Sequence, residues 1–451
     1  MNDLEVDVLV VGAGPAGLAA AAELRRLGVG RVLAVDREDQ AGGVPRHTGH
    51  TGFGLRDLHR CLGGPRYAAA WVARATAAGV RLRTATTVTG WAAAPAAAPG
   101  PPALELTGPD GLATVTARAV LLATGCRERP RPARLVPGTR PLGVLTTGAL
   151  QQLVHLHHQP VGQVAVVVGA EHVSFSALLT LAHAGASVAA VVTEAPRHQT
   201  FAALRAAAAV RWPRTRLLTA TRVSAILGPR RVEAVELTGL ATGTAHRLAC
   251  DTVVFTGDWI PDHELARAGG LAMDPGTRGP LVDQRLRTSV PGVFAAGNLL
   301  HGAETADVAA LDGRHAAAAI RDHLAGAPWP ARPPLPLTCL PPLRWAAPGA
   351  VAPGDGPPPM GRLVLRTAEP RDRARLQARQ GDRVLATGRA RRLVPNRSIP
   401  LPAGWLSRVD PDGGPLSLGV IEERRGTVAA AGRWRPPGPG RRGPPPGPGG
   451  S

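Results

Sequence analysis

Apolar residues form the same pattern twice along this chain: a short apolar run, a turn, a helix-like stretch and a second short run. The first instance starts with Val8–Val11, continues with the Ala/Leu/Arg stretch Leu18–Leu27 and ends with Val32–Val35. Short runs rich in β-branched residues are typical of buried parallel strands. The pattern therefore predicts a βαβ unit at the start of the chain.

The turn of this unit contains glycines at a spacing that nucleotide-binding proteins use. Gly12, Gly14 and Gly17 follow the first run as G-x-G-x-x-G, which allows a tight turn, close approach of a pyrophosphate to the backbone and close helix packing. Asp36 ends the second run at the distance from Gly17 where an acid can bind ribose hydroxyls. The unit predicts a dinucleotide site, and the alternative is a glycine-rich turn without a ligand.

The second instance repeats these elements in the middle of the chain. Val164–Val168 predicts a strand, residues 174–184 predict a helix, and Val188–Val192 predicts a second strand. A second βαβ unit is therefore expected here.

The turn of the second unit departs from the glycine pattern. Gly169 is kept, but Glu171 and Ser174 stand where the second and third glycines belong, and Glu194 follows the second strand. A carboxylate at the second position repels a phosphate, by about 1 kcal/mol at about 4 Å in water and by more in a shielded site. We expect a retained scaffold with a degenerate nucleotide site, and the alternative is that Glu171 turns aside and the site works.

The C-terminal third differs in composition. Residues 331–451 hold 23 of the 45 prolines, so the βαβ rhythm ends there. A Pro-rich linker is predicted over 327–360 and a small β-rich domain over 361–425. Residues 426–451 are rich in Gly, Pro and Arg and are predicted to be a disordered tail, because they cannot bury a core. Short strands are expected at Arg362–Leu365, Arg383–Ala386 and Leu416–Ile421.

Length and charge narrow the choice of partners. The 451 residues allow two or three domains, and their formal net charge is +19, all 52 basic residues being arginine. Residues 331–451 carry 20 arginines and eight acidic residues, a net +12 that leaves +7 for the rest of the chain. The arginines are not interleaved with aromatic residues, and the sequence has no nucleic-acid-binding motif. We expect no nucleic-acid partner, and we expect any docking surface in the C-terminal third.

Cysteines and apolar runs exclude further classes of protein. The four cysteines lie far apart with no C-x-x-C spacing, so we expect no metal site, no iron–sulfur cluster and no disulfide framework. Unpaired cysteines suit a reducing compartment, and the acidic N-terminus differs from a signal peptide. Every apolar run is interrupted by charge, proline or turn signals before it reaches the length of a membrane-spanning helix. A cytoplasmic protein without a membrane span is therefore predicted.

Three further segments carry a resemblance to known proteins. Gly42 and Gly43 follow Asp36 closely, LLATGCRERP spans 121–130, and SVPGVFAAGN spans 289–298. With the first glycine pattern, they make the chain resemble the FAD-dependent pyridine nucleotide-disulfide oxidoreductases. In that family the glycine pair passes beneath the FAD pyrophosphate, the A-T-G turn leaves the FAD domain, and the late segment returns to the flavin. The family usually has Asp where this chain has Asn298, whose amide can still hydrogen-bond a ribityl hydroxyl.

The resemblance implies an α/β fold with two Rossmann-like dinucleotide-binding domains, the second inserted in the first. The implied FAD-binding domain is discontinuous, at 1–138 and 285–326, and encloses an NAD(P)-binding-like domain at 139–284. FAD is the implied cofactor, and whether NAD(P) binds stays open. The implied FAD contacts are Gly12, Gly14, Pro15, Ala16, Gly17, Asp36, Arg37, Gly42, Gly43, Arg46, Val88, Ala123, Thr124, Gly125, Gly297, Asn298, Thr305 and Ala306.

A closer resemblance rests on three longer stretches, GGVPRHTGHTGFGLRDL, RERPRPARLVPGTRPLGVLTTGALQQL and FAAGNLLHGAETADVAALDG. These are similar to the FAD-binding subunits of hydrogen cyanide synthase, opine oxidase and dye-linked proline dehydrogenase, and to oxidoreductases that accompany glycerol-3-phosphate dehydrogenases. Such relatives work in multi-flavin complexes. The resemblance implies a second, substrate-oxidising flavoprotein as partner and, in some cases, a ferredoxin-like 2Fe-2S protein.

Candidate chemistry lies in the segments that the resemblance places at the flavin. Disulfide reductases of the family have two cysteines after the glycine pair, where this chain has Pro45 and His50, so dithiol chemistry is not expected. His47 and His50 are candidate proton carriers, because histidine titrates near neutral pH. His301 and Glu304 are candidates on the returning segment, and a structural role is the alternative for all four.

We therefore expect an FAD-dependent oxidoreductase subunit that oxidises a small amine, amino acid or hydroxy compound and passes electrons to a partner. A stand-alone NAD(P)H-dependent flavin reductase is one alternative, and it requires the degenerate second site to work. A flavin-binding scaffold without catalysis is the other alternative.

Overall fold

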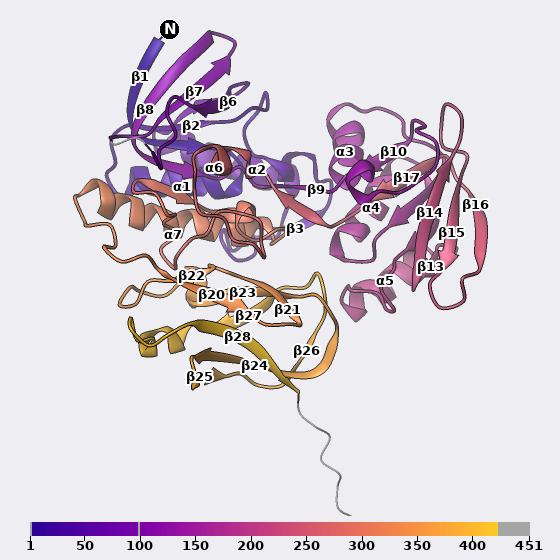
Figure 1. The fold of residues 1–451 in the computed structure, drawn as a ribbon. Coiled ribbons are helices and arrows are strands. Elements are labelled where there is room, and N and C mark those ends of the chain that lie inside the picture. Colours follow the sequence, from indigo (N-terminus) through magenta and orange to yellow (C-terminus); the bar gives the residue numbers. More distant parts are fainter. Residues whose placement is uncertain (1, 98–99, 423–451) are drawn as a thin grey trace, which may run out of the picture.

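The structure is a computed structural model that describes residues 2–97 and 100–422. Figure 1 shows three folded parts: a first domain coloured indigo to purple and completed by orange segments, a magenta second domain beside it, and an orange-to-yellow C-terminal domain against the first. The tail expected at 426–451 lies outside the described residues.

The first domain is built on a seven-stranded sheet of order β5-β2-β1-β8-β7-β6, with β19 also paired to β8. The carboxyl ends of four parallel strands are level, because Val11 pairs with both Val35 and Leu122, and Leu122 pairs with Ala295. Ligands of such sheets bind at this edge. The strands are β1 (Asn2–Val11), β2 (Val32–Val35), β5 (Arg81–Arg83), β6 (Thr87–Trp91), β7 (Ala103–Gly108), β8 (Gly111–Leu122) and β19 (Val293–Ala295).

Two helices pack closely beneath this edge. A Cβ at Gly17 would overlap the carbonyl oxygen of Gly12, and a Cβ at Gly313 would overlap that of Ala16, so the small residues allow the helices and the turn to meet. The pattern-based βαβ unit is confirmed, with a helix that begins three residues earlier and ends one residue earlier than expected. The remaining elements are α1 (Pro15–Arg26), η1 (Val44–His47), β3 (Thr51–Phe53), β4 (Leu62–Gly63), α2 (Gly64–Ala77), η4 (Gly297–Leu299) and α7 (Ala306–Leu324).

The second domain has a five-stranded parallel sheet of order β10-β17-β11-β12-β13 and a three-stranded antiparallel sheet, β14-β15-β16. The expected strand–helix–strand unit is confirmed as β11, α4 and β12. The elements are β10 (Val144–Thr146), α3 (Thr147–Gln151), η3 (Gln152–Leu156), β11 (Val164–Val168), α4 (His172–His183), β12 (Ser187–Val192), α5 (Ala202–Arg211), β13 (Arg216–Leu218), β14 (Thr221–Leu227), β15 (Ala234–Gly239), β16 (Ala245–Ala249) and β17 (Thr252–Phe255).

The chain crosses between these domains at a two-stranded ribbon, β9 (Cys126–Glu128) with β18 (Trp259–Pro261). The boundary expected at residue 285 is wrong, because the chain has already returned to the first domain after β18. Helix α6 (Glu264–Ala268) packs on the first domain, where Trp91 Nε1 donates to the carbonyl of Leu265 at 2.7 Å. Because the outgoing and returning strands pair with each other, both crossings occur at one place.

The C-terminal domain consists of two facing β-sheets that share one core. The three expected strands are confirmed as β23, β25 and β28, but the predicted linker over 327–360 is wrong, because three of its segments form strands whose apolar residues enter this core. The elements are β20 (Leu335–Cys339), β21 (Leu343–Ala347), β22 (Ala350–Val351), η5 (Pro359–Gly361), β23 (Arg362–Thr367), β24 (Arg371–Gln380), β25 (Arg383–Thr387), β26 (Arg391–Leu393), β27 (Ile399–Pro402), η6 (Gly404–Arg408) and β28 (Leu416–Glu422), besides η2 (Arg131–Arg134) of the second domain.

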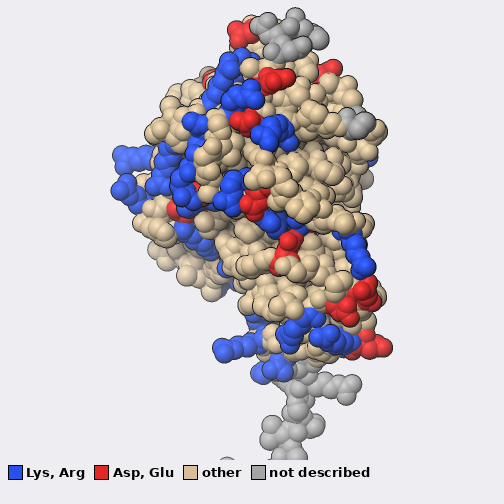
Figure 2. Space-filling view, turned by 90° about the vertical axis from the view of Figure 1, so that its left-hand side faces the viewer, with Lys and Arg blue, Asp and Glu red and all other residues tan. Residues whose placement is uncertain are grey.

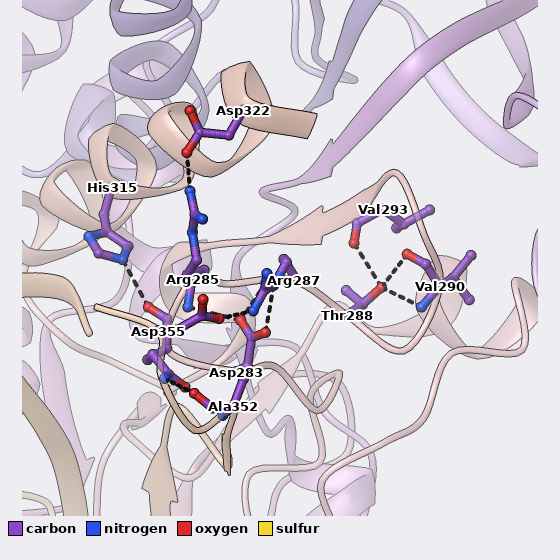
Figure 3. Close-up of polar contacts among 11 residues, drawn as sticks. Asp283, Arg285, Arg287, Thr288, Val290, Val293, His315, Asp322, Ala352 and Asp355 are labelled. Atoms are coloured by element: carbon purple, nitrogen blue, oxygen red, sulfur yellow. Dashed lines mark hydrogen bonds and ion pairs between the residues drawn. The ribbon is translucent and has the colours of Figure 1, made fainter. Parts of the chain in front are cut away.

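A buried polar joint fastens the C-terminal domain to the first domain (Figure 3). The Gln284 side chain donates to the Ala352 carbonyl at 2.6 Å and accepts from its N–H at 2.8 Å, which imitates a strand pair. Arg287 bridges Asp283, at 2.7 Å, and Asp355 of the C-terminal domain, and only 9% of the arginine side chain is exposed. The C-terminal domain is thus held by paired buried charges.

Charge on the visible surface is mixed. On the face shown in Figure 2, arginines lie among acidic residues and broad uncharged areas rather than in one continuous basic field. Within the described residues, no helix is long and apolar enough to cross a membrane.

The joint generates a stability prediction. Arg287→Ala leaves Asp283, whose side chain is 2% exposed, without its cation, so we expect a loss of about 3–5 kcal/mol in the free energy of unfolding. Arg332→Ala is the matched control, because its ion pair with Asp412 is exposed at both ends and exposed pairs contribute at most about 1 kcal/mol. Urea unfolding followed by tryptophan fluorescence measures both. Equal losses for the two variants would contradict a joint role for Arg287.

Candidate functional site

The start of α1 forms an open anion cradle at the carboxyl edge of the first sheet. Gly14 is the N-cap, no side chain caps the helix, and its first turn contains no acid, so the first backbone N–H groups face outward unpaired. Gly12 has φ +103°, and a Cβ there would overlap the carbonyl oxygen of Ala123. Only glycine fits this turn, which supports the reason given for the sequence pattern.

The expected glycine pair lies against this cradle. Gly42 donates its N–H to the carbonyl of Ala13 at 2.8 Å, and Gly43 has φ +63°. A Cβ on Gly43 would lie 2.9 Å from the Cα of Gly14, so the two backbones approach as closely as glycines allow. Two segments from different parts of the chain, the turn after β1 and the loop after β2, therefore line one side of the helix N-terminus.

Asp36 stands at the end of β2 beside the cradle. One carboxylate oxygen accepts the N–H of Ala13 at 2.8 Å, and the other accepts the N–H of Glu38 at 3.0 Å. The segment before β6 joins here, because the N–H of Thr86 donates to the Asp36 carbonyl at 2.8 Å, and this places Val88 two residues further along that strand. The carboxylate is thus fixed in direction at the position that the pattern assigns to ribose recognition.

Two arginines expected near the cofactor are engaged with acids. Arg46 donates to the Gln40 carbonyl at 2.9 Å and to Asp39 at 3.2 Å, so its guanidinium pins the loop after β2. Arg37 lies 3.5 Å from Asp262 at the crossover. Both arginines act on neighbouring loops, and no contact between described residues directs either of them to the cradle.

Residues 297–305, here called the return loop, follow β19 at the same edge. The Asn298 amide donates to the carbonyl of Glu304 at 3.1 Å, and its oxygen accepts the N–H of Glu304 at 3.0 Å, which closes the loop on itself. Gly297, at φ +74°, packs on Ala16 of α1, and Ala123 of the A-T-G turn, just after β8, belongs with Ala16 to one small buried cluster. Thr124 Oγ1 donates to the carbonyl of Asp262, which ties this turn, with Gly125, to the crossover.

The cradle, the glycine pair, Asp36 and the return loop all lie at the edge where four strands end. The open N–H groups of α1 and the backbone surface kept bare by Gly14 and Gly43 match a diphosphate, and the fixed carboxylate of Asp36 matches a ribose diol. These residues therefore fit FAD, and they would hold its adenosine and diphosphate portions.

The candidates His301 and Glu304 are both held by buried charge pairs. His301 Nε2 lies 2.5 Å from Asp312 Oδ2, and both side chains are buried. Burial lowers the pKa of His301, but the charge and hydrogen bond of Asp312 and the charge of Glu304 outweigh it and raise the pKa above its usual value. Glu304 pairs at 2.5 Å with Arg366 of the C-terminal domain, which stacks on Trp345. The C-terminal domain thus clamps the return loop.

The start of α7 has a partner that the sequence did not indicate. Thr305 is the N-cap, Ala306 begins the helix, and the buried Asp307 sits in its first turn. Asp307 accepts a hydrogen bond from Thr305 and lies 3.7 Å from Arg56. An acid already interacts with this helix N-terminus and its positive dipole end.

The two candidate histidines His47, in η1, and His50, just after it, differ in burial. His47 is buried, and burial lowers its pKa to about 4, so it is neutral at physiological pH. His50 is only half-buried and stacks on Phe53 with ring centroids 5.4 Å apart. His47 can therefore accept a proton only weakly, whereas His50 is accessible to solvent.

The second domain closes its own anion site with Glu171. Glu171 is the N-cap of α4, the counterpart of Gly14, and its side chain turns inward until only 6% of the residue is exposed. Its carboxyl accepts a hydrogen bond from Thr256 at the end of β17, and Gly169 and Gly257 lie against the same oxygens. Glu171 therefore occupies the place where a phosphate would meet the backbone.

Buried groups surround this carboxyl. Burial raises the pKa of Glu171, while the hydrogen bond from Thr256 and the charge of Arg134 lower it in part. Arg134 donates to the carbonyls of Thr256 and Gly257 at 3.0 and 2.8 Å. Ser174 Oγ lies 3.0 Å from Thr256 Oγ1 and is fully buried. Side chains of this chain thus fill the interior of the degenerate site.

The outer side of the degenerate site is covered as well. Glu194 is exposed and pairs with Arg222 through two contacts of 3.2 and 3.3 Å. Arg397 from the C-terminal domain lies 4.6 Å above the ring of Phe201, and the same ring meets His172 edge-on at 4.6 Å. A segment of the C-terminal domain therefore rests on the loop after β12, beside His172 at the start of α4.

Several residues of these sites escaped sequence reasoning because their signal is purely spatial. Thr256, Arg366 and Arg397 lie far apart in the sequence and belong to no motif, whereas Arg134 lies within RERPRPARL. The basic and acidic residues of RERPRPARL, next to the A-T-G turn, are the one local signal that could have indicated a charged cluster near residue 130.

Comparison with known proteins agrees with this geometry. A profile of the pyridine nucleotide-disulphide oxidoreductase family matches residues 6–313. The alpha chain of sarcosine oxidase from Corynebacterium sp. (strain P-1) is 32% identical over 201 residues, which are 42% of this chain and 19% of that protein. An opine oxidase subunit of Agrobacterium tumefaciens (strain Ach5) is 28% identical over 350 residues, 69% of this chain and 65% of that protein. The chain spans less than two thirds of either relative.

Solved structures show the same fold at low identity. Thioredoxin reductase of T. acidophilum superposes with a TM-score of 0.59 at 23% identity, over 70% of this chain and 97% of that one. L-proline dehydrogenase of P. horikoshii superposes with a TM-score of 0.53 at 18% identity, over 72% and 56% of the chains. The likeness supports the two-domain Rossmann-like architecture.

Glu128 at the crossover provides a pH-dependent prediction. Its Oε2 accepts the N–H of Gly148 at 2.8 Å, its Oε1 is buried without a partner among the described residues, and burial, with the charge of Glu171, raises its pKa from 4.5 to about 7. The folded protein therefore binds the proton more tightly than the unfolded chain. The contribution of Glu128 to the free energy of unfolding is therefore greatest below pH 4.5, and it is lost as the pH rises from 4.5 to about 7.

We expect Glu128→Gln to remove this loss. The variant should match the wild type near pH 4.5 and exceed its free energy of unfolding by on the order of 3 kcal/mol at pH 8. Glu105→Gln, on an exposed position of β7, is the control and should change neither value. Denaturant unfolding across this pH range measures the difference, and parallel curves for wild type and Glu128→Gln would refute the assignment.

Proposed function

Because the chain belongs to the pyridine nucleotide-disulphide oxidoreductase family and its first domain fits FAD, we propose that it is the FAD-binding subunit of a multi-subunit dehydrogenase or oxidase. FAD, when bound, supplies a two-electron acceptor. The residues of this chain would bind and orient it: the α1 cradle at the diphosphate, Asp36 at the ribose, and the return loop near the flavin.

One observation carries this proposal: the α1 cradle is open, and the equivalent α4 site is filled by Glu171. A dinucleotide in the second domain would have to displace a buried carboxyl from Thr256 and approach past Arg397. We propose that NAD(P)H does not deliver electrons here. The electrons would instead come from a small substrate oxidised within the complex.

The proposal excludes a dithiol step, in contrast to the thioredoxin reductases that share the fold. The segment after the glycine pair forms η1, which has Pro45 where those reductases have a thiol. All four cysteines belong to the described residues and are free, and Cys61 lies on the surface in the first domain, while Cys250 is buried in the second. Cys126 directly follows the A-T-G turn, but residues 44–60 after the glycine pair contain no cysteine, so the proposal includes no dithiol step.

The partner and substrate follow from the relatives. Two of them are subunits of a sarcosine oxidase and of an opine oxidase, so we propose a small amine or amino acid as the substrate of the complex, with a small hydroxy compound as the next candidate. The partner we propose is a second flavoprotein, with a ferredoxin-like chain as a further acceptor.

Gly14→Glu tests the FAD site. A Cβ at Gly14 meets nothing nearer than the Gly43 Cα at 3.9 Å, so the side chain fits the protein but places a carboxylate in the anion cradle. We expect the purified variant to lose at least about 90% of its FAD, because like charges repel in the site. Gly404→Glu, at an exposed open position, is the control and should keep its FAD. Flavin absorbance per chain is the measurement, and a yellow Gly14→Glu protein would refute the assignment.

Stopped-flow mixing tests the electron source. NADH or NADPH should bleach the flavin of the purified chain no faster than buffer, because Glu171 fills the second site. A small amino acid should bleach it once the proposed flavoprotein partner is added. Rapid bleaching by a nicotinamide alone would establish a stand-alone reductase instead, and a flavin that no donor reduces would favour a scaffold role.

A further inference from the structure

Helix α5 of the second domain is exposed along its whole length. None of its ten residues is buried, and α5 makes no extensive packing contact with another element in the described part of the chain. Leu204 is 42% exposed and Val210 83%, and Leu217 just beyond the helix is 41% exposed. Helices this short are marginal in water unless one face packs against something. The exposed apolar residues of α5 would therefore be stabilised by packing against another surface.

The segment that contains α5 is strongly basic. Residues 195–232 contain eight arginines and no acidic residue. Arg205, Arg211 and Arg214 are exposed, and none of the ion pairs between described residues includes them. Two other arginines of the segment are paired, Arg197 with Asp372 and Arg222 with Glu194. A surface of this kind is complementary to an acidic one.

The start of α5 is held in place even though the helix itself is uncovered. Phe201, the N-cap, is held between His172 and Arg397. Arg397 Nε also donates to the carbonyl of Gln199 at 2.7 Å, and Asn396 donates to the Gln199 side chain at 2.6 Å. The C-terminal domain thus fixes the loop from which α5 projects, which lowers the conformational entropy that a partner would have to remove.

We propose that α5 with residues 212–217, here called the α5 face, is a docking surface for an acidic, partly apolar surface of the partner protein in the complex. The inference rests on the proposed function, because it locates the contact of the complex. Six of the ten residues of α5 are alanine, which allows a partner backbone to approach closely. A membrane-surface helix would need bulky apolar residues on its buried face, and single-stranded nucleic acid would need exposed stacking aromatics interleaved with the arginines. The aromatic residue of the face, Trp212, packs against the core of the second domain instead.

The test uses the full chain with FAD and the proposed flavoprotein partner, co-expressed and analysed by sedimentation at low and high salt. Arg205→Glu/Arg211→Glu reverses two charges of the α5 face. Arg81→Glu/Arg247→Glu reverses two exposed charges elsewhere and is the matched control. We expect the first variant to keep its FAD and to bind the flavoprotein at least about tenfold more weakly at low salt, and the control to bind like the wild type.

Each other outcome has a defined meaning. If the wild type binds the flavoprotein and the α5 variant binds equally well, the docking proposal is wrong and the proposed function stands. If the wild type holds FAD but does not bind the flavoprotein, the proposed complex fails and the docking proposal with it. Vesicles of phosphatidylglycerol and a single-stranded oligonucleotide are tested in parallel. Binding to either that the α5 variant loses, with flavoprotein binding unchanged, would assign the face to that ligand instead.

Discussion

A helix that starts at the carboxyl edge of a parallel sheet presents unpaired backbone N–H groups and the positive end of its dipole, and these must meet something negative. The two Rossmann-like domains of this chain satisfy that constraint in opposite ways. At α1 the N-cap is Gly14, and the groups stay open beside a bare backbone surface. At α4 the N-cap is Glu171, whose carboxyl folds into the site and is held by Thr256. The residue at one pair of equivalent positions therefore separates an open helix N-terminus from a closed one.

The closed second site has consequences for the groups around it. A buried carboxyl is costly unless it is paired or protonated, and Glu171 is accompanied by Arg134 and by the second buried acid Glu128. The three groups lie where the chain crosses between the domains, since Glu128 belongs to β9 and Arg134 follows closely. A charged cluster thus accompanies the closed N-terminus of α4 at the crossover that both domains share.

The C-terminal domain connects the two sites through arginines. Arg366 clamps Glu304 of the return loop, Arg287 receives Asp355 at the joint, and Arg397 covers the loop before α5. Each contact is formed by a guanidinium that also stacks on an aromatic ring, in a chain that has no lysine. Arginine can pair with a carboxylate and stack at the same time, which lysine cannot do equally well. The net positive charge did not indicate a partner, but individual arginines stabilise the contacts between the domains.

The sequence by itself determined the two βαβ units, the first glycine cradle with Asp36, the departure at Glu171 and the strands β23, β25 and β28. These features depend on local periodicity and on short spacings along the chain. Strands, helices and glycine turns each impose a regular backbone geometry, so each leaves a recognisable spacing of residue types in the sequence. Only the tertiary structure decided that the Pro-rich stretch from 335 to 351 enters a β-sheet, that the chain returns to the first domain near residue 259, and that Arg366 and Arg397 reach the two sites. Those outcomes rest on contacts between residues far apart in the chain. The stability of these contacts depends on how deeply the residues are buried and on which distant residues pair with them. No local sequence pattern encodes either.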